Sequence, residues 1–272
     1  MPHGLDTTSA ASPATANGYV LEAAGIRKAF GANVAISNAS MNLREAEVMG
    51  LVGDNGAGKS TFLKILSGSQ PADEGTITIE GKRVELRTPA DALAAGIETV
   101  YQDLALVDTM DAAQNVFLGR ERSAAGLAGL FGFVSDRKMR AEVGELVKDL
   151  GVNIPSLRAT VRSMSGGQRQ SLAIARAVLW GRRIVILDEP TAALGVRETA
   201  HVLDLIRRLR DRGISVIVVS HNMQQLREVA DRVTVMRLGR TVTTRDIAST
   251  SVEDLIGLIT GAVIPDETIS TP

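Results

Sequence analysis

The stretch that decides the fold of this chain is GDNGAGKST, residues 53–61. It fits the pattern G-x-x-x-x-G-K-[ST], in which two fixed glycines precede a lysine and a hydroxyl residue. An apolar run of strand length, residues 47–52, comes directly before it, and residues 62–66 have the pattern of a helix that begins there. This combination of strand, loop and helix predicts a loop whose backbone N–H groups surround a chain of phosphates.

Each part of the loop has an expected task. Lys59 is expected to reach the β- and γ-phosphates, and the Ser60 hydroxyl is placed to bind Mg²⁺. The positive end of the following helix adds favourable charge where the phosphates lie. The alternative is a chance glycine-rich turn, but the flanking strand and helix argue against it. The residues predicted to bind the nucleotide are Gly53, Asp54, Asn55, Gly56, Ala57, Gly58, Lys59, Ser60 and Thr61.

Composition limits the class of protein further. The chain has 272 residues, of which 44% are hydrophobic and 22% are charged, so it can bury a sizeable core. Its formal net charge of −1 gives no sign of a nucleic-acid-binding surface, and the absence of cysteine excludes disulfides and thiolate metal sites. No apolar run reaches the length of a membrane span. We therefore expect one large α/β domain, with or without an inserted subdomain.

The two ends of the chain have the composition of tails. Residues 1–18 are rich in Ala, Ser, Thr and Pro, and they lack the basic start and apolar centre of a secretory signal. We predict that they are disordered, and we assign residues 262–272 to a C-terminal tail.

Strand patterns dominate the first hundred residues. Residues 19–30 and 34–43 have strand character and flank a predicted turn at residues 31–33. Phe30, at the end of the first of these strands, has two equally supported interpretations: a core residue, or an aromatic platform on which an adenine base stacks. Further along, the sequence predicts a hairpin over residues 76–84, a short helix over 89–95, and a buried strand over 97–101 that ends at Gln102.

Helical patterns replace strand patterns between residues 104 and 164. Helices are predicted at 112–118 and 136–150, with a loop of small residues at 123–132. No heptad pattern continues for long, which argues against a coiled coil. We interpret residues 104–164 as an inserted helical subdomain.

A helix start follows at Ser165-Gly166-Gly167-Gln168. Ser165 and Gln168 have the spacing of a capping box, with the serine as N-cap and the glutamine three residues later. The two glycines also leave backbone N–H groups bare at a positive helix end, which is how an anion site is built. From physical considerations alone, a plain helix start is favoured over an anion site.

Two carboxylates follow the next strand pattern. After Arg183, residues 184–187 are four apolar residues without alternation, which fits a parallel strand buried on both faces. Ligands of open α/β sheets bind at the carboxyl ends of strands, where Asp188 and Glu189 stand. Asp188 is the expected partner of Ser60 for Mg²⁺, and Glu189 is expected to handle the attacking water. The alternative is that both carboxylates cap the next helix.

A second strand pattern, residues 214–219, ends in Ser220-His221. A lone histidine is more often structural, but at a strand end of this kind a contact with the γ-phosphate is equally well supported. The remaining predicted elements are a helix at 197–210, a hairpin at 232–240 and a helix at 251–258.

Together these motifs resemble the nucleotide-binding subunit of ABC transporters over residues 19–261. Residues 53–61 are similar to the Walker A loop of that family, and RIVILDEPT (residues 183–191) is similar to its Walker B strand with the catalytic glutamate. MSGGQ (residues 164–168) resembles the LSGGQ signature, with Met164 in place of leucine. Phe30, Gln102 and His221 match the aromatic A-loop, the Q-loop and the switch histidine.

The resemblance implies a fold and a division of the chain. The fold is an α/β P-loop NTPase with a RecA-like mixed sheet, an antiparallel β subdomain and an inserted α-helical subdomain. Residues 19–103 and 165–261 would form the ATPase core, and residues 104–164 the helical subdomain.

The resemblance also implies roles for single residues. Phe30 would stack on adenine, and the signature residues would contact ATP held by a partner chain across a dimer interface. The implied signature contacts are Ser165, Gly166, Gly167 and Gln168. The implied catalytic residues are Glu189, His221, Gln102 and Lys59, and the implied Mg²⁺ ligands are Ser60, Gln102 and Asp188.

The implied partners of the chain are a second copy of itself or a like subunit, an integral-membrane permease and, indirectly, a substrate-binding protein, with no nucleic acid. The chain would lie peripherally on the cytoplasmic face of the membrane, hydrolysing ATP in the presence of Mg²⁺.

Two stretches carry a finer likeness, to sugar-import ATPases of the ribose, xylose and fructose type: residues 101–121 and 188–198. The chain resembles the form with a single nucleotide-binding domain, and a monosaccharide is the implied solute. The alternatives are an importer for another solute, or a soluble ABC ATPase that is not tied to transport. One departure from the family is Gly195, where an aspartate that helps to order the dimer interface is usual.

Overall fold

The computed structural model describes residues 18–124, 134–181 and 183–263. The predicted N-terminal tail lies outside these residues except for Gly18, and the predicted C-terminal tail is described only as far as residue 263. Most of the predicted small-residue loop at 123–132 also lies outside them.

The described strands form one sheet with the order β5-β4-β1-β2-β10-β9-β3-β8-β7-β6. Five neighbouring strands at one end, β9, β3, β8, β7 and β6, run parallel, and β10 runs antiparallel to β9. At the other end, β1, β2, β4 and β5 pair antiparallel. The strands are β1 (Tyr19–Phe30), β2 (Asn33–Arg44), β3 (Val48–Gly53), β4 (Glu74–Ile79), β5 (Lys82–Val84), β6 (Ile97–Val100), β7 (Ile184–Asp188), β8 (Ser215–Val219), β9 (Arg232–Arg237) and β10 (Arg240–Asp246).

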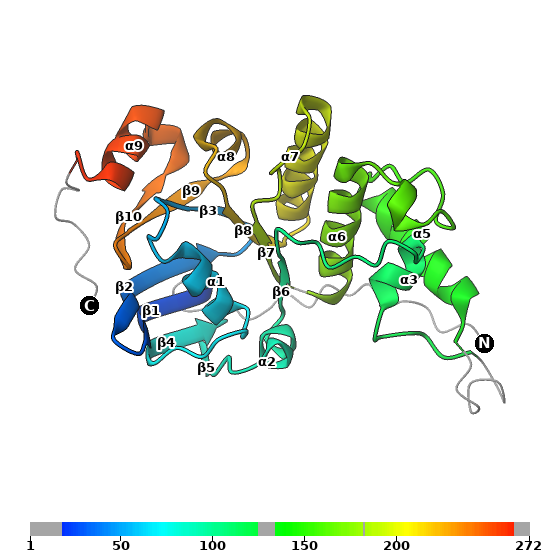
Figure 1. Ribbon diagram of the computed structural model, residues 1–272, viewed down its shortest axis with the longest axis horizontal. Coiled ribbons are helices and arrows are strands. Elements are labelled where there is room, and N and C mark those ends of the chain that lie inside the picture. The colour runs from blue at the N-terminus through cyan, green and yellow to red at the C-terminus, as the bar shows by residue number, and fades with distance from the viewer. Residues whose placement is uncertain (1–17, 125–133, 182, 264–272) are drawn as a thin grey trace.

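Helices cover both faces of the parallel strands. Figure 1 shows α7, α8 and α9 on one side, and α1 on the other side, between the parallel strands and the antiparallel ones. The helices are α1 (Lys59–Leu66), α2 (Pro89–Ala94), α3 (Ala112–Phe117), α5 (Asp136–Asp149), α6 (Gly166–Trp180), α7 (Val196–Asp211), α8 (Met223–Val229) and α9 (Val252–Thr260), with single 3₁₀ turns η1 (Val161–Ser163) and η2 (Ile247–Ser249). This mixed sheet with its covering helices confirms the predicted P-loop α/β fold.

The two faces of the parallel strands belong to two different hydrophobic cores. On β8, Ile217 and Val219 pack with α1 and the antiparallel strands, whereas Val216 and Val218 pack with α6, α7, α8 and α9. Side chains that alternate between two buried faces require apolar residues at every position. This is why β7 and β8 have continuous apolar sequences rather than an alternating pattern.

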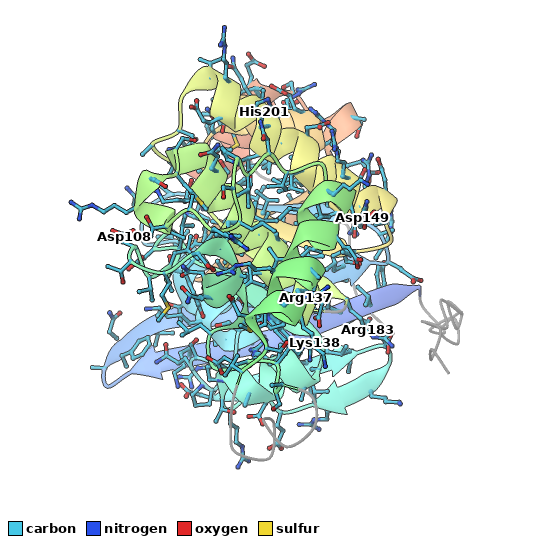
Figure 2. The ribbon with its side chains drawn as sticks, turned by 90° about the vertical axis from the view of Figure 1, so that its right-hand side faces the viewer. Asp108, Arg137, Lys138, Asp149, Arg183 and His201 are labelled. Atoms are coloured by element: carbon cyan, nitrogen blue, oxygen red, sulfur yellow. The ribbon has the colours of Figure 1, made fainter. Side chains whose placement is uncertain are left out.

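A third hydrophobic cluster joins α3, α5 and α6 at the far end of the molecule (Figure 1). The rings of Phe117 and Trp180 meet edge to face with their centroids 5.5 Å apart, and the Trp180 indole N–H donates to the Val116 carbonyl at 2.8 Å. Figure 2 views this end and shows Arg137 and Lys138 on α5, with Asp149 at the end of that helix. Arg212 after α7 donates to Asp149, so α5 is tied to the core of the molecule.

The structure also contains a helix that the sequence did not predict. α8 begins after Asn222, whose side chain accepts a hydrogen bond from the Gln225 backbone N–H, and it is only seven residues long. Its sequence MQQLREV buries two side chains, Leu226 and Val229. So short an apolar stripe does not stand out from a polar loop.

Phe62 offers a test of the packing around the P-loop helix. Its side chain is fully buried on α1 between the two sheet regions. Phe62→Ala is expected to lower the free energy of unfolding by about 3–5 kcal/mol, because it removes apolar contact and leaves a cavity. Equilibrium unfolding in urea measures this loss. Val34→Ala, at a half-exposed position, is the control and is expected to change stability little.

Candidate active site

Four neighbouring parallel strands end at the same edge of the sheet, and each end carries a predicted site residue. In the order β3-β8-β7-β6, these ends lead into the loop at Gly53, into His221, into Asp188 and into Gln102. The register pairs Asp188 with Val219, so the ends of β7 and β8 are level. The topology therefore brings together residues that are up to 168 positions apart in the sequence, since Gly53 and His221 lie in adjacent loops.

The loop after β3 has the geometry of a phosphate cradle. A Cβ at Gly53 would lie 2.3 Å from the Met236 carbonyl oxygen, so only glycine fits there. Gly58 is the N-cap of α1 with φ +99°, and no side chain caps this helix, so the N–H groups of its first turn stay open for an anion. Lys59 Nζ donates to the carbonyls of Gly53, at 2.7 Å, and Asp54, at 3.0 Å, which holds its charge over the loop.

Lys59 and the carboxylates at this edge act on one another's pKa values. Burial lowers the pKa of Lys59, although the negative charges of Glu189, Asp54 and Asp188 act against this shift. Burial and the neighbouring Glu189 charge raise the pKa of Asp188, which Lys59 partly offsets. A cation bound between Asp188 and a phosphate chain would favour the ionised form of Asp188 and so reduce the free-energy cost of its charge.

Neither carboxylate caps a helix, so that alternative is wrong. Helix α7 begins at Val196 and its N-cap is Gly195, six residues beyond Glu189. The Glu189 backbone has φ +50°, and its N–H donates to the Val219 carbonyl at 3.0 Å, which turns its side chain out of the strand direction.

Glu189 and His221 contact each other directly. His221 Nδ1 lies 2.9 Å from Glu189 Oε1, with the carboxylate largely buried and the imidazole exposed. Behind them, the Thr191 hydroxyl donates to Gln225 Oε1 at 2.6 Å and ties the loop after β7 to α8. The pair is a carboxylate that can accept a proton, held beside an imidazole that can donate a hydrogen bond. No pattern in the sequence predicted the contact between Thr191 and Gln225, which are 34 positions apart.

The remaining two predicted residues, Phe30 and Gln102, both lie on the surface. The Phe30 residue is 46% exposed at the end of β1, which excludes the interpretation as a core residue. Gln102 is exposed directly after β6.

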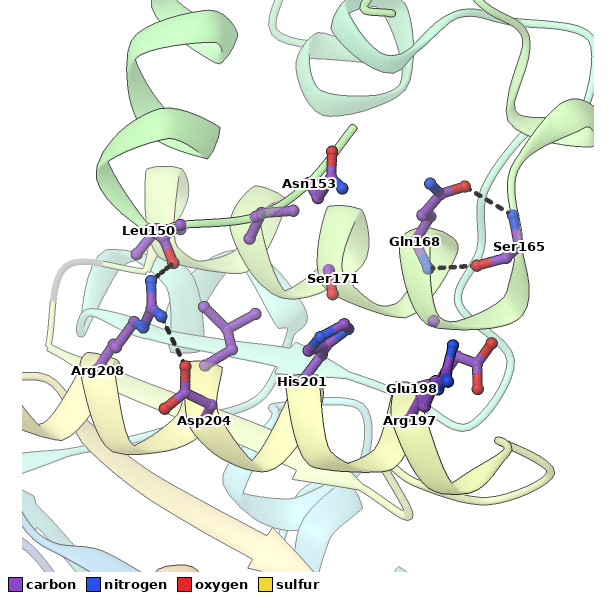
Figure 3. A pocket seen from close by; sticks show the side chains of 14 residues that line it. Leu150, Asn153, Ser165, Gln168, Ser171, Arg197, Glu198, His201, Asp204 and Arg208 are labelled. Atoms are coloured by element: carbon purple, nitrogen blue, oxygen red, sulfur yellow. Dashed lines mark hydrogen bonds and ion pairs between the residues drawn. The ribbon is translucent and has the colours of Figure 1, made fainter. Parts of the chain in front are cut away.

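The turn at Ser165 forms the predicted capping box. The Ser165 Oγ accepts from the Gln168 N–H at 3.3 Å, and Gln168 Oε1 accepts from the Ser165 N–H at 2.9 Å (Figure 3). Among the described residues, no hydrogen bond joins this turn to the loop at 53–61. It lies at one end of a cavity of about 430 Å³ between α6 and α7, which is lined by several side chains of α7, including His201 and Arg208 (Figure 3).

The loop after β7 packs directly on this turn. A Cβ at Gly166 would lie 3.2 Å from Leu194 Cδ2, and a Cβ at Gly167 would lie 2.6 Å from Glu198 Cγ. The Glu198 Oε2 atom lies 2.7 Å from the place that a Cβ at Gly195 would take. The second glycine of the turn is therefore required by packing within the chain, a requirement that the sequence alone did not reveal.

The residues present fit Mg²⁺ with a nucleotide. Ser60, in the first turn of α1, offers a hydroxyl oxygen, and Asp188, at the end of β7, offers a carboxylate oxygen. No group of three His, Cys, Asp or Glu side chains in the described ranges could hold a metal ion alone. Such a site suits Mg²⁺, which keeps few protein ligands and completes its shell with phosphates and water.

Comparison with known proteins places this geometry in a family. Residues 36–192 match the family described as ABC transporter, which is more than half of the chain. The chain belongs to the ABC transporter family. As an ATP-binding subunit of this family, it binds ATP with Mg²⁺ and hydrolyses it.

Curated relatives extend the match over most of this ABC ATPase. It is 42% identical to the fructose import ATP-binding protein FrcA of Rhizobium meliloti, over 90% of this chain and 95% of the relative. It is 41% identical to the xylose/arabinose import ATP-binding protein XylG of Sulfolobus acidocaldarius, over 89% and 94%. The ribose import ATP-binding protein RbsA of Bacillus licheniformis is 39% identical, but the chain spans only 47% of it.

Solved structures support the fold of this ABC ATPase. An ATP-binding cassette of an ABC transporter in its ADP conformation aligns with a TM-score of 0.74 at 22% identity, over 89% of this chain and 95% of that one. A dimeric bacterial ABC transporter cassette aligns with a TM-score of 0.67 at 23% identity, over 84% and 98%. None of the helices in the described ranges has both the length and the apolar character of a membrane span.

The raised pKa of Asp188 leads to a prediction about stability. Because ionising Asp188 costs the folded state free energy, Asp188→Asn is expected to raise the Tm of the nucleotide-free protein at pH 7. This difference in Tm between the variant and the native chain is fully present above the raised pKa of Asp188. It disappears below the ordinary pKa of 3.8, where the aspartic acid is as neutral as the asparagine. Thermal unfolding at several pH values between about pH 3.5 and about pH 7 measures this difference in Tm. The acid end of the range lies within about one unit of the ordinary pKa values of carboxylic acids.

The same variant is expected to lose most of the Tm increase that MgATP gives the native chain, because a metal ligand is gone. A lower Tm without nucleotide, or an undiminished response to MgATP, would contradict the role of Asp188.

Proposed function

We propose that this chain is the ATP-hydrolysing subunit of an importer for a monosaccharide, acting as a pair of chains on a membrane permease. The main support for this proposal is the pair formed by Glu189 and His221, whose Oε1 and Nδ1 atoms lie 2.9 Å apart in a chain with an intact phosphate loop. The relatives of the chain are named for fructose and xylose/arabinose import. The pair provides a base next to a hydrogen-bond donor, which is what hydrolysis of a bound triphosphate needs.

Each residue at the sheet edge has a proposed task in hydrolysis. Lys59 binds the β- and γ-phosphates, and Phe30 stacks on the adenine. Glu189 accepts the proton of the attacking water or orients it, and His221 donates to the γ-phosphate as charge builds up. Phosphoryl transfer depends mainly on positioning and electrostatic stabilisation, so donors around one base are sufficient.

The metal site is proposed from the same edge. Ser60, Asp188 and Gln102 would hold Mg²⁺, of which Gln102 follows β6 and the other two stand on α1 and β7. When bound, Mg²⁺ neutralises charge on the phosphates.

The signature turn is proposed to act on the partner's ATP. Within one chain, Gly167 packs against Glu198 of α7, and the N–H groups of Gly166 and Gly167 lie at the positive end of the 15-residue helix α6. Such an end is suited to a γ-phosphate that arrives from outside the chain. Two chains would then enclose two ATP molecules, and each chain would contribute half of each site.

The helical region would transmit the motion. We propose residues 104–164 as a subdomain that docks on the permease at the cytoplasmic face of the membrane, with residues 19–103 and 165–261 as the core. Gln102 stands two residues before this region begins, so it would connect the γ-phosphate to the movement of α3 and α5. The coupling between the two sites depends on the loop at Gly195, where Glu198 is the nearest carboxylate.

A permease test separates this proposal from a soluble ABC ATPase. We expect the chain to copurify with a membrane permease from its native host, and we expect a monosaccharide-loaded binding protein to stimulate the ATPase of that complex. Stimulation by a non-sugar solute alone would shift the proposal to another importer. Copurification with nucleic acid or ribosomes, and not with a permease, would overturn it.

A further inference from the structure

The end of β1, which carries Phe30, is anchored on one side by a side chain instead of a strand. On its other side β1 pairs with β2 to its last residue, where Phe30 lies opposite Asn33. Towards β4, however, the pairing stops at Arg27, which lies opposite Glu74. The three residues Lys28, Ala29 and Phe30 therefore extend past the end of the β4 ladder.

Asp73 takes the place of the missing strand. Its Oδ2 accepts from the Ala29 backbone N–H at 2.7 Å, and its own N–H donates to the Arg27 carbonyl at 2.9 Å. Its other oxygen, Oδ1, accepts from Lys28 Nζ at 2.6 Å. The hydrogen bond from Lys28 and that from Ala29 lower the pKa of Asp73, so the carboxylate is charged at neutral pH.

The lysine in this contact also touches the ring. Lys28 is a buried residue, only 8% exposed, and its Nζ lies 5.8 Å from the centroid of the Phe30 ring. A cation at this distance is attracted to the face of an aromatic ring. Asp73 thus fixes both the backbone before Phe30 and the cation that lies over its ring.

We propose that Asp73 is a positioning residue for the purine base, which holds Phe30 through Lys28 and Ala29 in the orientation that stacks on adenine. This inference rests on the proposed role of Phe30 and adds to it a residue from the loop between α1 and β4. Asp73 does not touch the nucleotide in this account; it acts on base recognition only through the ring.

The prediction separates base binding from phosphate binding. Asp73→Ala is expected to weaken MgATP binding about 3- to 10-fold, because a loosened ring loses part of the stacking energy. Binding of magnesium tripolyphosphate, which has no base, is expected to change less than about twofold, since the loop at 53–61 is untouched. Titration calorimetry with both ligands measures the two affinities.

Two further variants make the test specific. Glu74→Ala removes the neighbouring exposed ion pair with Arg27 and leaves Lys28 and the ring in place, so it is expected to bind ATP as the native chain does. In a Phe30→Ala background, Asp73→Ala is expected to add no further loss, because the two residues act through one contact. Thermal unfolding of each variant checks that the fold is retained.

The outcomes are distinct. Native ATP affinity in Asp73→Ala, an equal loss for ATP and tripolyphosphate, or an additive loss with Phe30→Ala would each overturn the role of Asp73 while leaving the proposed function intact. Failure of the native chain to bind ATP more tightly than tripolyphosphate would overturn the base platform itself, and the role of Asp73 with it.

Discussion

Glu189→Gln is expected to keep ATP binding and to abolish turnover. The amide retains the size of the side chain and its contact with His221 but cannot accept a proton, and loss of a general base lowers rates about 10²- to 10⁴-fold. Because hydrolysis then no longer separates the chains, a closed ATP-bound dimer is expected to accumulate. Steady-state ATPase measurements and size-exclusion chromatography in MgATP test the two parts.

Glu228→Gln is the matched control for this variant. Glu228 is an exposed glutamate on α8 that pairs with Arg207 away from the strand ends, so its ATPase is expected to stay at the native level. An unchanged turnover in Glu189→Gln would refute the assignment of Glu189 as the base.

Lys59→Ala is expected to remove nucleotide binding. Lys59 brings a partly buried positive charge to the place where the β- and γ-phosphates lie, and removing one partner of such a charged contact costs about 2–5 kcal/mol, or about 30-fold or more in affinity. Titration with a fluorescent ATP analogue measures the loss.

Lys82→Ala, at an exposed lysine on β5, is the control and is expected to bind the analogue normally. Micromolar affinity retained in Lys59→Ala would contradict the predicted role of the loop.

Much of the catalytic edge could be predicted because each part of it is encoded locally. The apolar run at 184–187 indicated a parallel strand buried on both faces, and the run at 214–219 indicated a second strand. The two carboxylates and the histidine that follow these runs were therefore expected at strand ends. The capping box at Ser165 needs only four consecutive residues and was correctly predicted. The roles of single residues in catalysis remain predictions, which the variants above test.

What could not be predicted depends on contacts between distant segments. Asp73 meets Lys28 across 45 positions, and Glu198 meets Gly167 between two helices, and neither pair has a periodic pattern. Phe30 was compatible with the core or the surface, because an isolated aromatic residue at a strand end fits both. Only the packing of the folded chain, with Phe30 half exposed, ruled out the core, and its role as an adenine platform remains a prediction.

The same packing gives Gly195 a new context. The usual aspartate is absent at this position, which is the N-cap of α7. Glu198, in the first turn of α7, places its Oε2 atom 2.7 Å from where a Cβ at Gly195 would lie. A carboxylate near this helix end is electrostatically favourable, so the loop keeps a negative group despite the glycine.

The central claim, that each ATP site is shared between two chains, is tested most directly by mixing two inactive variants. Lys59→Ala lacks a working phosphate loop, and Gly167→Ala disrupts the signature turn, because its new Cβ would lie 2.6 Å from Glu198 Cγ. A mixed pair holds one site with both defects and one site with neither.

We expect an equimolar mixture to recover about a quarter of the native ATPase, since half of the pairs are mixed and each holds one intact site of two. A mixture that stays as inactive as its two components would contradict a shared site.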